Sequence, residues 1–138
     1  MGYPKIGEVF ELTLDGNDPN VQPLAMVKNY GYNPEGWKHD GKTVEGQQTQ
    51  KFKLVQKGGS WDEIGKEVGN DLEGQWLEAF RKAYPESNGK HPVGVHDASW
   101  VVPYGSAYFP YVGRDGGPGF LWSGHVFSVS WLWLVPVK

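Results

Sequence analysis

The side chains best placed to do chemistry lie between His96 and Ser99. His96 and Asp97 are adjacent, and Ser99 follows two positions later. A histidine that takes the proton of a serine hydroxyl is an arrangement used in nucleophilic hydrolysis. Further serine and histidine candidates are Ser106, Ser123 and His125. No Gly-x-Ser-x-Gly motif places a serine at a sharp strand-to-helix turn. A small hydrolase is therefore an alternative that no motif supports.

Metal ligands are poorly spaced. His91 and His96 are five residues apart, and the adjacent His96 and Asp97 would point to opposite faces of a strand. The stretch DGNDPN has the Asp and Asn content of a calcium loop (Asp15, Asn17, Asp18), but it lacks the glycine and distal glutamate of an EF-hand. We expect an Asx-rich turn there, and neither a metal nor a cofactor.

Two other catalytic patterns are incomplete. No spacing singles out a carboxylate pair for glycoside hydrolysis, although Glu8, Glu11, Asp97 and Asp115 are available. The glycine-rich GRDGGPG is followed by neither a helix nor a Lys-Ser/Thr pair, so it does not form a phosphate loop. We expect a protein that is not an enzyme.

Composition narrows the class further. A length of 138 residues suits one domain, residues 1–138, with one real core. The net charge is −3 without a basic stripe, so no nucleic-acid binding is expected. Cysteine is absent, no apolar run approaches the ~20 residues of a membrane span, and no signal peptide is visible at the start. We therefore expect no membrane insertion and predict no particular location.

The amino-terminal half alternates strand and turn signals. A strand should end near Asp15, residues 24–30 form a second strand or a short helix, residues 31–46 form a loop, and residues 49–56 form a strand. Two helices should follow. Ser60 with Glu63 forms a capping box for a helix that stops near Gly69, and Asn70 with Glu73 repeats the signal for a helix that Pro85 ends. Gly74 in this second segment indicates a close packing contact.

Beyond residue 91 the chain changes character, because residues 99–138 carry only three charged side chains, Arg114, Asp115 and Lys138. Residues 92–102 should form a regular or irregular strand and residues 107–112 another. Two short terminal strands should be joined tightly near Gly124. Their alternation predicts a buried aromatic face. Its members are Phe120, Trp122, Phe127, Trp131 and Trp133, with Val129, Val135 and Val137 of the same parity as the last three.

The opposite face mixes small polar and medium apolar residues without charge. An ordinary solvated face would carry Lys, Glu, Asp or Arg, as the rest of this chain does. Short uncharged side chains lose little entropy when a ligand immobilises them. This face is therefore a candidate binding surface, and the alternative is that the amino-terminal strands cover it.

The pattern GQW…AF…YP…PVGVHDASWVVPYGSAYFPYV…DGG…F…W…G…F…WLWLV resembles the variable proteins of diversity-generating retroelements, mainly over residues 72–138. The resemblance implies an α+β, C-type-lectin-like single domain with two helices and a mainly antiparallel sheet. It also implies a carboxy-terminal segment, about residues 104–132, that adenine-directed mutagenesis rewrites. Asn-type template codons can yield Tyr, Ser, Gly, His, Val, Leu, Asp, Arg and others, and cannot yield Trp, Lys, Glu, Gln or Met. The animal-lectin calcium motif and a disulfide are both absent.

The candidate ligand-binding residues alternate with the aromatic framework, and all are of types such codons can yield. They are Tyr104, Ser106, Tyr108, Gly117, Gly119, Leu121, Ser123, His125, Val126, Ser128, Ser130 and Leu132. The resemblance implies a scaffold for a macromolecular ligand, which we expect to be a protein; tyrosine with serine and glycine is typical of antibody paratopes. The first alternative is a carbohydrate-binding module, which exposed tryptophans would favour.

Binding energy concentrates in a central cluster of anchors. A diversified binder should therefore bring Tyr104, Tyr108, Leu121, His125 and Ser130 onto one exposed patch. A scattered arrangement would favour the carbohydrate-binding module instead.

Overall fold

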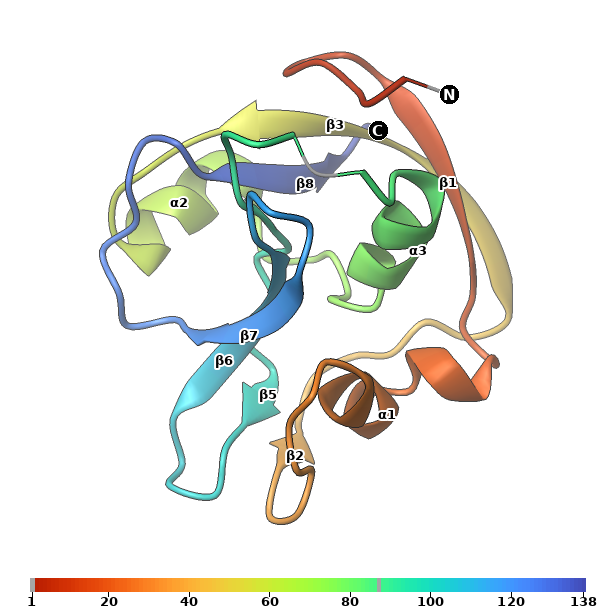
Figure 1. Ribbon diagram of the computed structural model, residues 1–138, viewed down its shortest axis with the longest axis vertical. Coiled ribbons are helices and arrows are strands. Elements are labelled where there is room, and N and C mark those ends of the chain that lie inside the picture. Colours follow the sequence, from red (N-terminus) through yellow and green to blue (C-terminus); the bar gives the residue numbers. More distant parts are fainter. Residues whose placement is uncertain (1, 87) are drawn as a thin grey trace.

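A computed structural model describes residues 2–86 and 88–138 (Figure 1). The fold is α+β, as predicted, with helices packed on a mainly antiparallel sheet. The described residues form three α-helices and not the two that were expected, because residues 23–29 also form a helix. The elements are β1 (Phe10–Asp15), the 3-10 turn η1 (Pro19–Val21), α1 (Pro23–Asn29), β2 (Lys38–His39), β3 (Gln47–Gln56), α2 (Trp61–Val68), α3 (Trp76–Ala83), β4 (Val93–Gly94), β5 (Trp100–Val101), β6 (Ala107–Val112), β7 (Pro118–Trp122) and β8 (Leu132–Pro136).

The sheet runs in the order β1-β3-β8-β4-β6-β5-β2, and β7 pairs with β6. All pairs are antiparallel except β4 with β8. β1 and β3 curve together past α3, and β8 lies beside β3 (Figure 1). β8 is therefore an inner strand with neighbours on both edges, not one of a terminal pair of strands.

β4 and β5 are two pieces of one interrupted strand along β6. Val93 pairs with Val112 and Trp100 with Tyr108, while residues 95–99 leave the ladder. Pro110 sits opposite this break and has no N–H to donate. The prediction of a regular or irregular strand over residues 92–102 is confirmed in its irregular form.

The first predicted helix is confirmed in detail. The Ser60 hydroxyl accepts the N–H of Glu63, and the Glu63 carboxylate accepts the N–H of Ser60, so the capping box is complete. The helix ends at Gly69, whose φ of 83° is easy only for glycine. Residues 24–30 lie mostly in the short helix α1, the second of the two forms that were expected.

The predicted start of the second helix, with Asn70 and Glu73 as a capping box, is wrong. α3 begins at Trp76, and its N-cap residue Gln75 makes no side-chain capping bond, so Asn70 and Glu73 precede the helix in a turn. The helix ends before Pro85, as predicted. The close contact at Gly74 is confirmed, because a Cβ there would lie 2.5 Å from the ring of Trp100.

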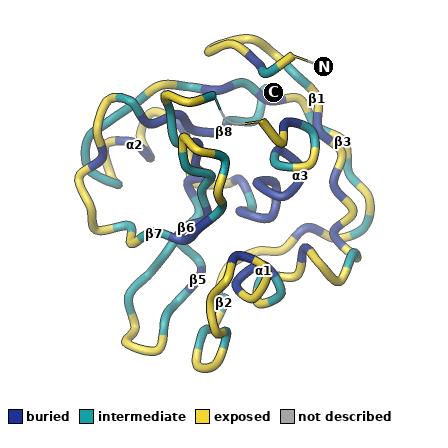
Figure 2. The backbone as a smooth tube through the Cα atoms, viewed as in Figure 1, coloured by how far each residue is buried: buried dark blue, intermediate teal, exposed yellow. Residues whose placement is uncertain are grey.

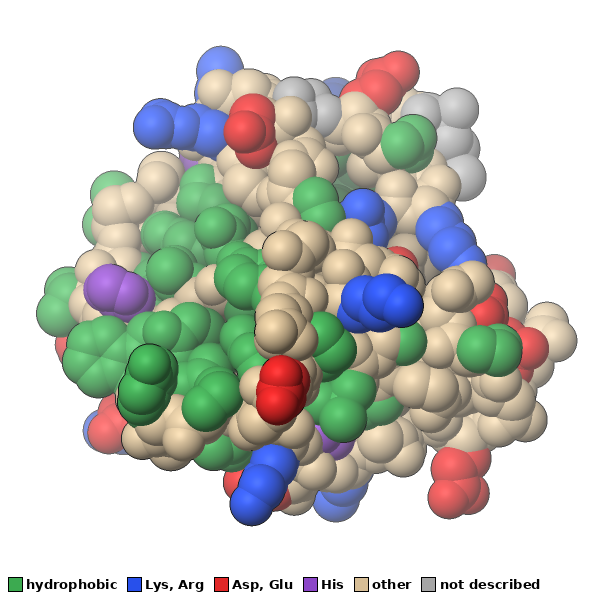
Figure 3. Space-filling view, turned by 60° about the horizontal axis from the view of Figure 1, so that its bottom comes forward, with side chains coloured by type: hydrophobic (Ala, Val, Ile, Leu, Met, Phe, Trp, Pro, Cys, Tyr) green, Lys and Arg blue, Asp and Glu red, His purple; other side chains and the backbone are tan. Residues whose placement is uncertain are grey.

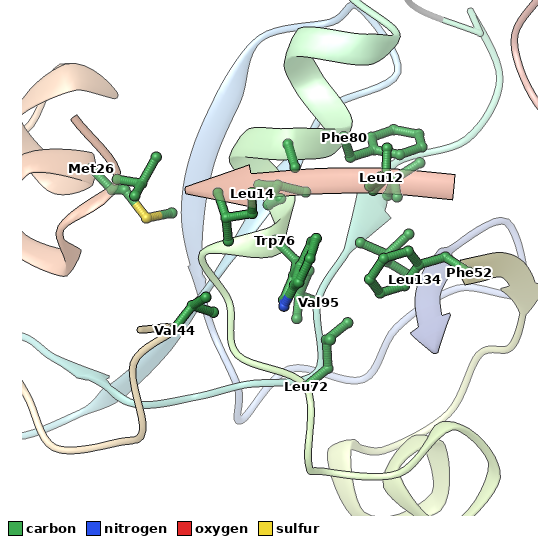
Figure 4. Packing of buried hydrophobic residues seen from close by; sticks show 14 of the residues in the cluster. Leu12, Leu14, Met26, Val44, Phe52, Leu72, Trp76, Phe80, Val95 and Leu134 are labelled. Atoms are coloured by element: carbon green, nitrogen blue, oxygen red, sulfur yellow. The ribbon is translucent and has the colours of Figure 1, made fainter. Parts of the chain in front are cut away.

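The core consists of two clusters on the two sides of the sheet. The larger joins β1, β3 and α3 around Phe52, Trp76 and Phe80 (Figure 4). The smaller packs α2 against Phe109 and Trp133, with Phe127 and Trp131 at its edge. Because both faces of β8 are covered, Leu132 and Leu134 belong to the first cluster while Trp133 belongs to the second.

The predicted aromatic face is mostly, but not wholly, buried. Phe120, Phe127, Trp131 and Trp133 are at most 9% exposed. Trp122 is 44% exposed, so its predicted burial is wrong. The segment from Phe127 to Trp131 is also not a strand, since it forms one isolated bridge and then a turn. Strand alternation therefore does not extend to Val129, which is 76% exposed.

Candidate functional site

The β6–β7 hairpin divides the predicted binding residues between its two faces. Residues directly opposite each other in a ladder share a face. Tyr108 pairs with Trp122, whereas Leu121 pairs with Phe109 on the other face. Tyr108 packs against Trp37, with 5.9 Å between ring centres. The prediction that Tyr108 and Leu121 belong to one patch is therefore wrong, because neighbouring strand positions face opposite ways.

Leu121 and Ser130 do come together. Both line a groove of about 470 Å³ between the β6–β7 turn and the loop that leads into β8. His125 lies farther along the same loop, with its ring 5.3 Å from that of Trp122. Tyr104 is 96% exposed in the β5–β6 turn, which projects beyond the rest of the sheet (Figure 1). The five predicted anchors are thus spread over a groove, a loop, a separate turn and the far face of the hairpin.

The outer edge of β7 is closed to strand addition. The hydroxyl of Tyr32 accepts the N–H of Phe120 at 3.3 Å and lies 3.5 Å from its carbonyl oxygen. Pro118 at the start of the strand has no N–H to offer. An exposed sheet edge normally invites another chain to pair with it. A ligand at this site would instead be contacted mainly by side chains.

The loop from Ser123 to Trp131 has its backbone fixed by other parts of the chain. Phe127 and Gly59 exchange both backbone hydrogen bonds, at 2.8 and 2.9 Å. The side-chain amide of Gln56 donates to the carbonyl of Val129 at 2.7 Å. The Nδ1–H of His91 donates to the carbonyl of Ser130, also at 2.7 Å. None of these bonds depends on a side chain of the loop itself.

Gly58 lets the loop lie flat against the β3–α2 connection. A Cβ at this position would lie 2.7 Å from both the carbonyl carbon of Ser128 and the nitrogen of Val129. Backbone atoms cannot move aside as the end of a flexible side chain can. Gly58 is therefore required by close approach of two backbones, not by an unusual φ.

The loop's side chains are exposed except at Phe127 and Trp131, which are buried in the smaller core cluster, and at the half-buried Ser123 and Ser130. Val126 is 83% exposed and Val129 is 76% exposed, and Figure 2 shows most of the loop as exposed. Hydrophobic side chains form a broad area on this side of the molecule, with few charges in it (Figure 3). Large exposed apolar areas on a folded domain mark interaction sites. The surface combines aliphatic groups, one half-exposed indole and several hydroxyls.

The twelve sequence-predicted residues fall into three groups. The exposed ones are Tyr104, Gly117, His125, Val126 and Ser128; the half-buried ones are Ser106, Tyr108, Leu121, Ser123 and Ser130; the buried ones are Gly119 and Leu132. Leu132 is 2% exposed because β8 is covered on both faces, so its assignment to the binding surface is wrong. Gly119 lies under the ring of Tyr111, where a Cβ would approach within 2.9 Å. We therefore also exclude Gly119 from the candidate binding residues.

Three residues of this surface escaped the sequence analysis. Trp122 and Val129 were assigned to the core by their parity. Tyr111 was not selected, yet its ring lines the groove beside that of Trp131, with 5.6 Å between ring centres. One signal could have shown that Val129 lies in a turn and not in a strand. Serines flank Val129 on both sides, and small polar residues are typical of turns.

The histidine and serine candidates for hydrolysis are not paired. The Nε2–H of His96 donates to the carbonyl of Trp61 at 2.8 Å, and its ring stacks on that of Trp61 at 3.6 Å. The hydroxyl of Ser99 donates to Asp97, and that of Ser123 donates to the carbonyl of Ala107 at 3.1 Å. Asp97 also accepts the N–H of Gly74 at 2.8 Å, ahead of α3. Each of these four side chains, His96, Asp97, Ser99 and Ser123, is thus hydrogen-bonded within the fold, and no serine is bonded to a histidine among them.

Asp15 and Asp18 form the Asx-rich turn that was expected. Asp15 accepts the N–H of Asn17 at 3.0 Å, and Asp18 accepts that of Asn20 at 2.9 Å. Across residues 2–86 and 88–138, no cluster of His, Asp and Glu has the geometry to hold a metal ion. No helix within those same ranges is long and apolar enough to cross a membrane.

We expect the protein to lose stability as the pH falls below about 6.5. Burial lowers the pKa of both His96 and His39 below the ordinary value for histidine. Below the ordinary histidine pKa of about 6.5, the unfolded chain binds protons that the folded chain does not, so the free energy of unfolding falls. Thermal melts across this range should show a weaker pH dependence for His96→Phe, which keeps an aromatic ring on Trp61. An unchanged dependence would contradict this assignment.

Comparison with known protein families, with curated protein sequences and with solved structures found no match to this chain.

Proposed function

We propose that this protein is a ligand-binding scaffold of C-type-lectin-like type, whose carboxy-terminal surface is diversified by a retroelement. The observation that carries the proposal is the loop from Ser123 to Trp131. Its backbone is held by Gln56, Gly59 and His91, which lie outside the proposed variable segment. Its exposed side chains can be exchanged without loss of core packing, because Val126, Ser128 and Val129 belong to neither core cluster, whereas Phe127 and Trp131 must stay.

The expected ligand is a protein. The surface presents aliphatic side chains and hydroxyls with little charge, and the core of a protein–protein interface is likewise depleted in charge. The loop is already ordered by its anchors, so less conformational entropy is lost on binding than with a free loop. Exchange of side chains on a fixed backbone would alter specificity while keeping this preorganisation.

A carbohydrate-binding module is the second candidate, and it is favoured by the scattered arrangement of the five predicted anchors and by Trp122. Its ring is 44% exposed beside the exposed His125, and Tyr108 does not join the loop. One exposed indole is less than a stacking platform of several rings. Quenching of tryptophan fluorescence by a panel of oligosaccharides, lost in Trp122→Ala, would favour this alternative over a protein ligand.

Replacing Ser123, His125, Ser128 and Ser130 together by asparagine should change stability by less than about 0.5 kcal/mol per site, the usual range for surface changes. Ser128 and Ser130 hydrogen-bond mainly to each other, and His125 is exposed. Ser123 donates to the carbonyl of Ala107, and the asparagine amide keeps a donor at that position. A thermal melt checks this. Phe109→Asn is the control that should unfold the protein, because Phe109 is fully buried. Collapse of the fourfold variant would show that this face is packed.

The binding function itself is tested with a displayed library. Ser123, His125, Val126, Ser128 and Val129 are randomised, variants that resist protease are retained, and these are selected against a panel of unrelated proteins. We expect many folded variants and specific binders among them. The control library randomises the exposed side chains of β1 and β3, namely Glu11, Thr13, Thr49 and Lys51, and should give folded variants with few binders. Equal yields from both libraries would contradict the proposal.

A further inference from the structure

The groove beside the anchored loop has an apolar floor and a basic rim. Leu121, Tyr111 and Trp131 form the floor. Lys90 and Arg114 lie at its border, together with the hydroxyls of Ser128 and Ser130. Its volume of about 470 Å³ lies within the range of roughly 300–1,000 Å³ that is usual for ligand pockets.

The two cations at this rim are not held in ion pairs among the described residues. Among the described residues, the ion pairs are Arg81 with Glu78 and Lys82 with Asp18. Asp115 also lines the groove, but its carboxylate accepts the N–H of Gly117 at 3.0 Å, within its own turn. Asp115 keeps its negative charge, so Lys90 and Arg114 leave the groove with an excess of one positive charge, in a chain whose net charge is −3.

We propose that the groove takes an acidic segment of a protein ligand, with an aliphatic side chain on the floor and a carboxylate at Lys90 and Arg114. This deepens the proposed function and rests on it for the identity of the ligand as a protein. Complementary charge supplies specificity and speeds association more than it adds affinity.

The two cations at the rim are proposed to stay constant, whereas the loop side chains are proposed to vary, and this difference matters for specificity. Lys90 lies outside the proposed variable segment, and Arg114 lies inside it without being one of the proposed variable positions. Leu121, Ser128 and Ser130 are proposed variable positions. A preference for acidic segments would thus be constant across variants, and the exchanged side chains would decide which acidic segment binds. A sugar is less suited to this groove, because Trp131 is only 9% exposed and offers little ring face for stacking.

The test uses a short peptide in which leucines are flanked by glutamates, titrated into the whole protein labelled for NMR. We expect shifts of the Trp131 indole and of the amides of Arg114, Ser128 and Ser130, with weaker binding at higher salt. The variant Lys90→Gln/Arg114→Gln should bind roughly 2- to 30-fold more weakly, as expected for two exposed charge contacts. The charge-matched control Lys51→Gln/Lys53→Gln, on β3, should bind as the unmodified protein does.

Two further peptides decide between explanations. A peptide with lysines in place of the glutamates should not bind, and one with serines in place of the leucines should bind more weakly. Equal binding of the lysine peptide, shifts confined to other surfaces, or an unchanged affinity in Lys90→Gln/Arg114→Gln would overturn the proposal. Because these probes need no diversified segment, failure here leaves the proposed retroelement origin standing. Conversely, binding here would survive the finding that the loop does not vary.

Discussion

Replacing Trp133 by alanine should lower the free energy of unfolding by about 3–5 kcal/mol, the range for large-to-small changes of a fully buried aromatic residue. Trp133 has no exposed surface, and its indole N–H donates to the carbonyl of Lys57 at 2.9 Å. Its ring lies between those of Trp61 and Trp131. Removing it leaves a cavity at the junction of α2 and β8, and frees the carbonyl next to Gly58. Urea unfolding measures the loss.

Trp122→Ala is the matched control, because it removes the same atoms from a ring that is 44% exposed. Folding removes less of the Trp122 ring from water than of the Trp133 ring, so the fall in the free energy of unfolding should be much smaller. Equal losses for the two variants would show that the smaller cluster does not hold the carboxy-terminal segment in place.

Replacing Gly58 by alanine should cost about 1–3 kcal/mol, the usual range for overpacking a closely fitted site. The new methyl group would overlap the backbone of Ser128 and Val129 at 2.7 Å. Because the overlap is with backbone, the loop must move away. The amide signals of Ser128, Val129 and Ser130 should therefore shift in NMR spectra, along with the fall in melting temperature.

Gly2→Ala serves as the control for this change, since nothing lies within 4 Å of a Cβ at Gly2. It should leave both the melting temperature and the loop signals unchanged. If Gly58→Ala behaves like Gly2→Ala, the loop is not pressed against the β3–α2 connection, and the rigid-backbone basis of the proposed function is lost.

Much of the fold follows from local signals in the sequence. The capping box of Ser60 and Glu63 located α2 because each partner satisfies an N–H that the helix leaves free. The terminal aromatic residues were predicted to be core, and four of the five are, since large rings dominate burial. Gly74 indicated a close contact because glycine is costly near a helix and is kept where a Cβ does not fit.

The alternation of apolar and polar residues did not predict the buried face correctly in β8. A strand reveals its buried face only when the other face meets water. β8 lies between β3 and β4 with a core cluster on each side, so Leu132 and Trp133 are both buried. The sequence could not reveal this, because the covering residues come from α2, α3 and β1. Leu132 was therefore misassigned to the binding surface.

The sequence located the exposed, weakly charged region as a segment, but it did not show which way the individual side chains of that segment face. The scarcity of charge after residue 99 marked the region, whereas the orientation of Val129 and Tyr108 depends on a turn and a hairpin register that no local signal specified. Exposed valines contradict the general preference for burial of apolar residues. Departures of this kind are expected at functional surfaces, where selection acts on binding instead of stability.

The proposal of a diversified surface is tested most directly by sequencing the DNA that encodes these residues, with the adjoining DNA, in many cells of one culture. We expect substitutions at the codons of exposed loop positions such as His125, Val126 and Ser128, and none at Gln56, Gly58, His91 or Trp133. A near-copy carrying adenines at the variable codons should lie close by, next to a reverse transcriptase gene. Identical sequences in every cell, with no near-copy in the adjoining DNA, would contradict it.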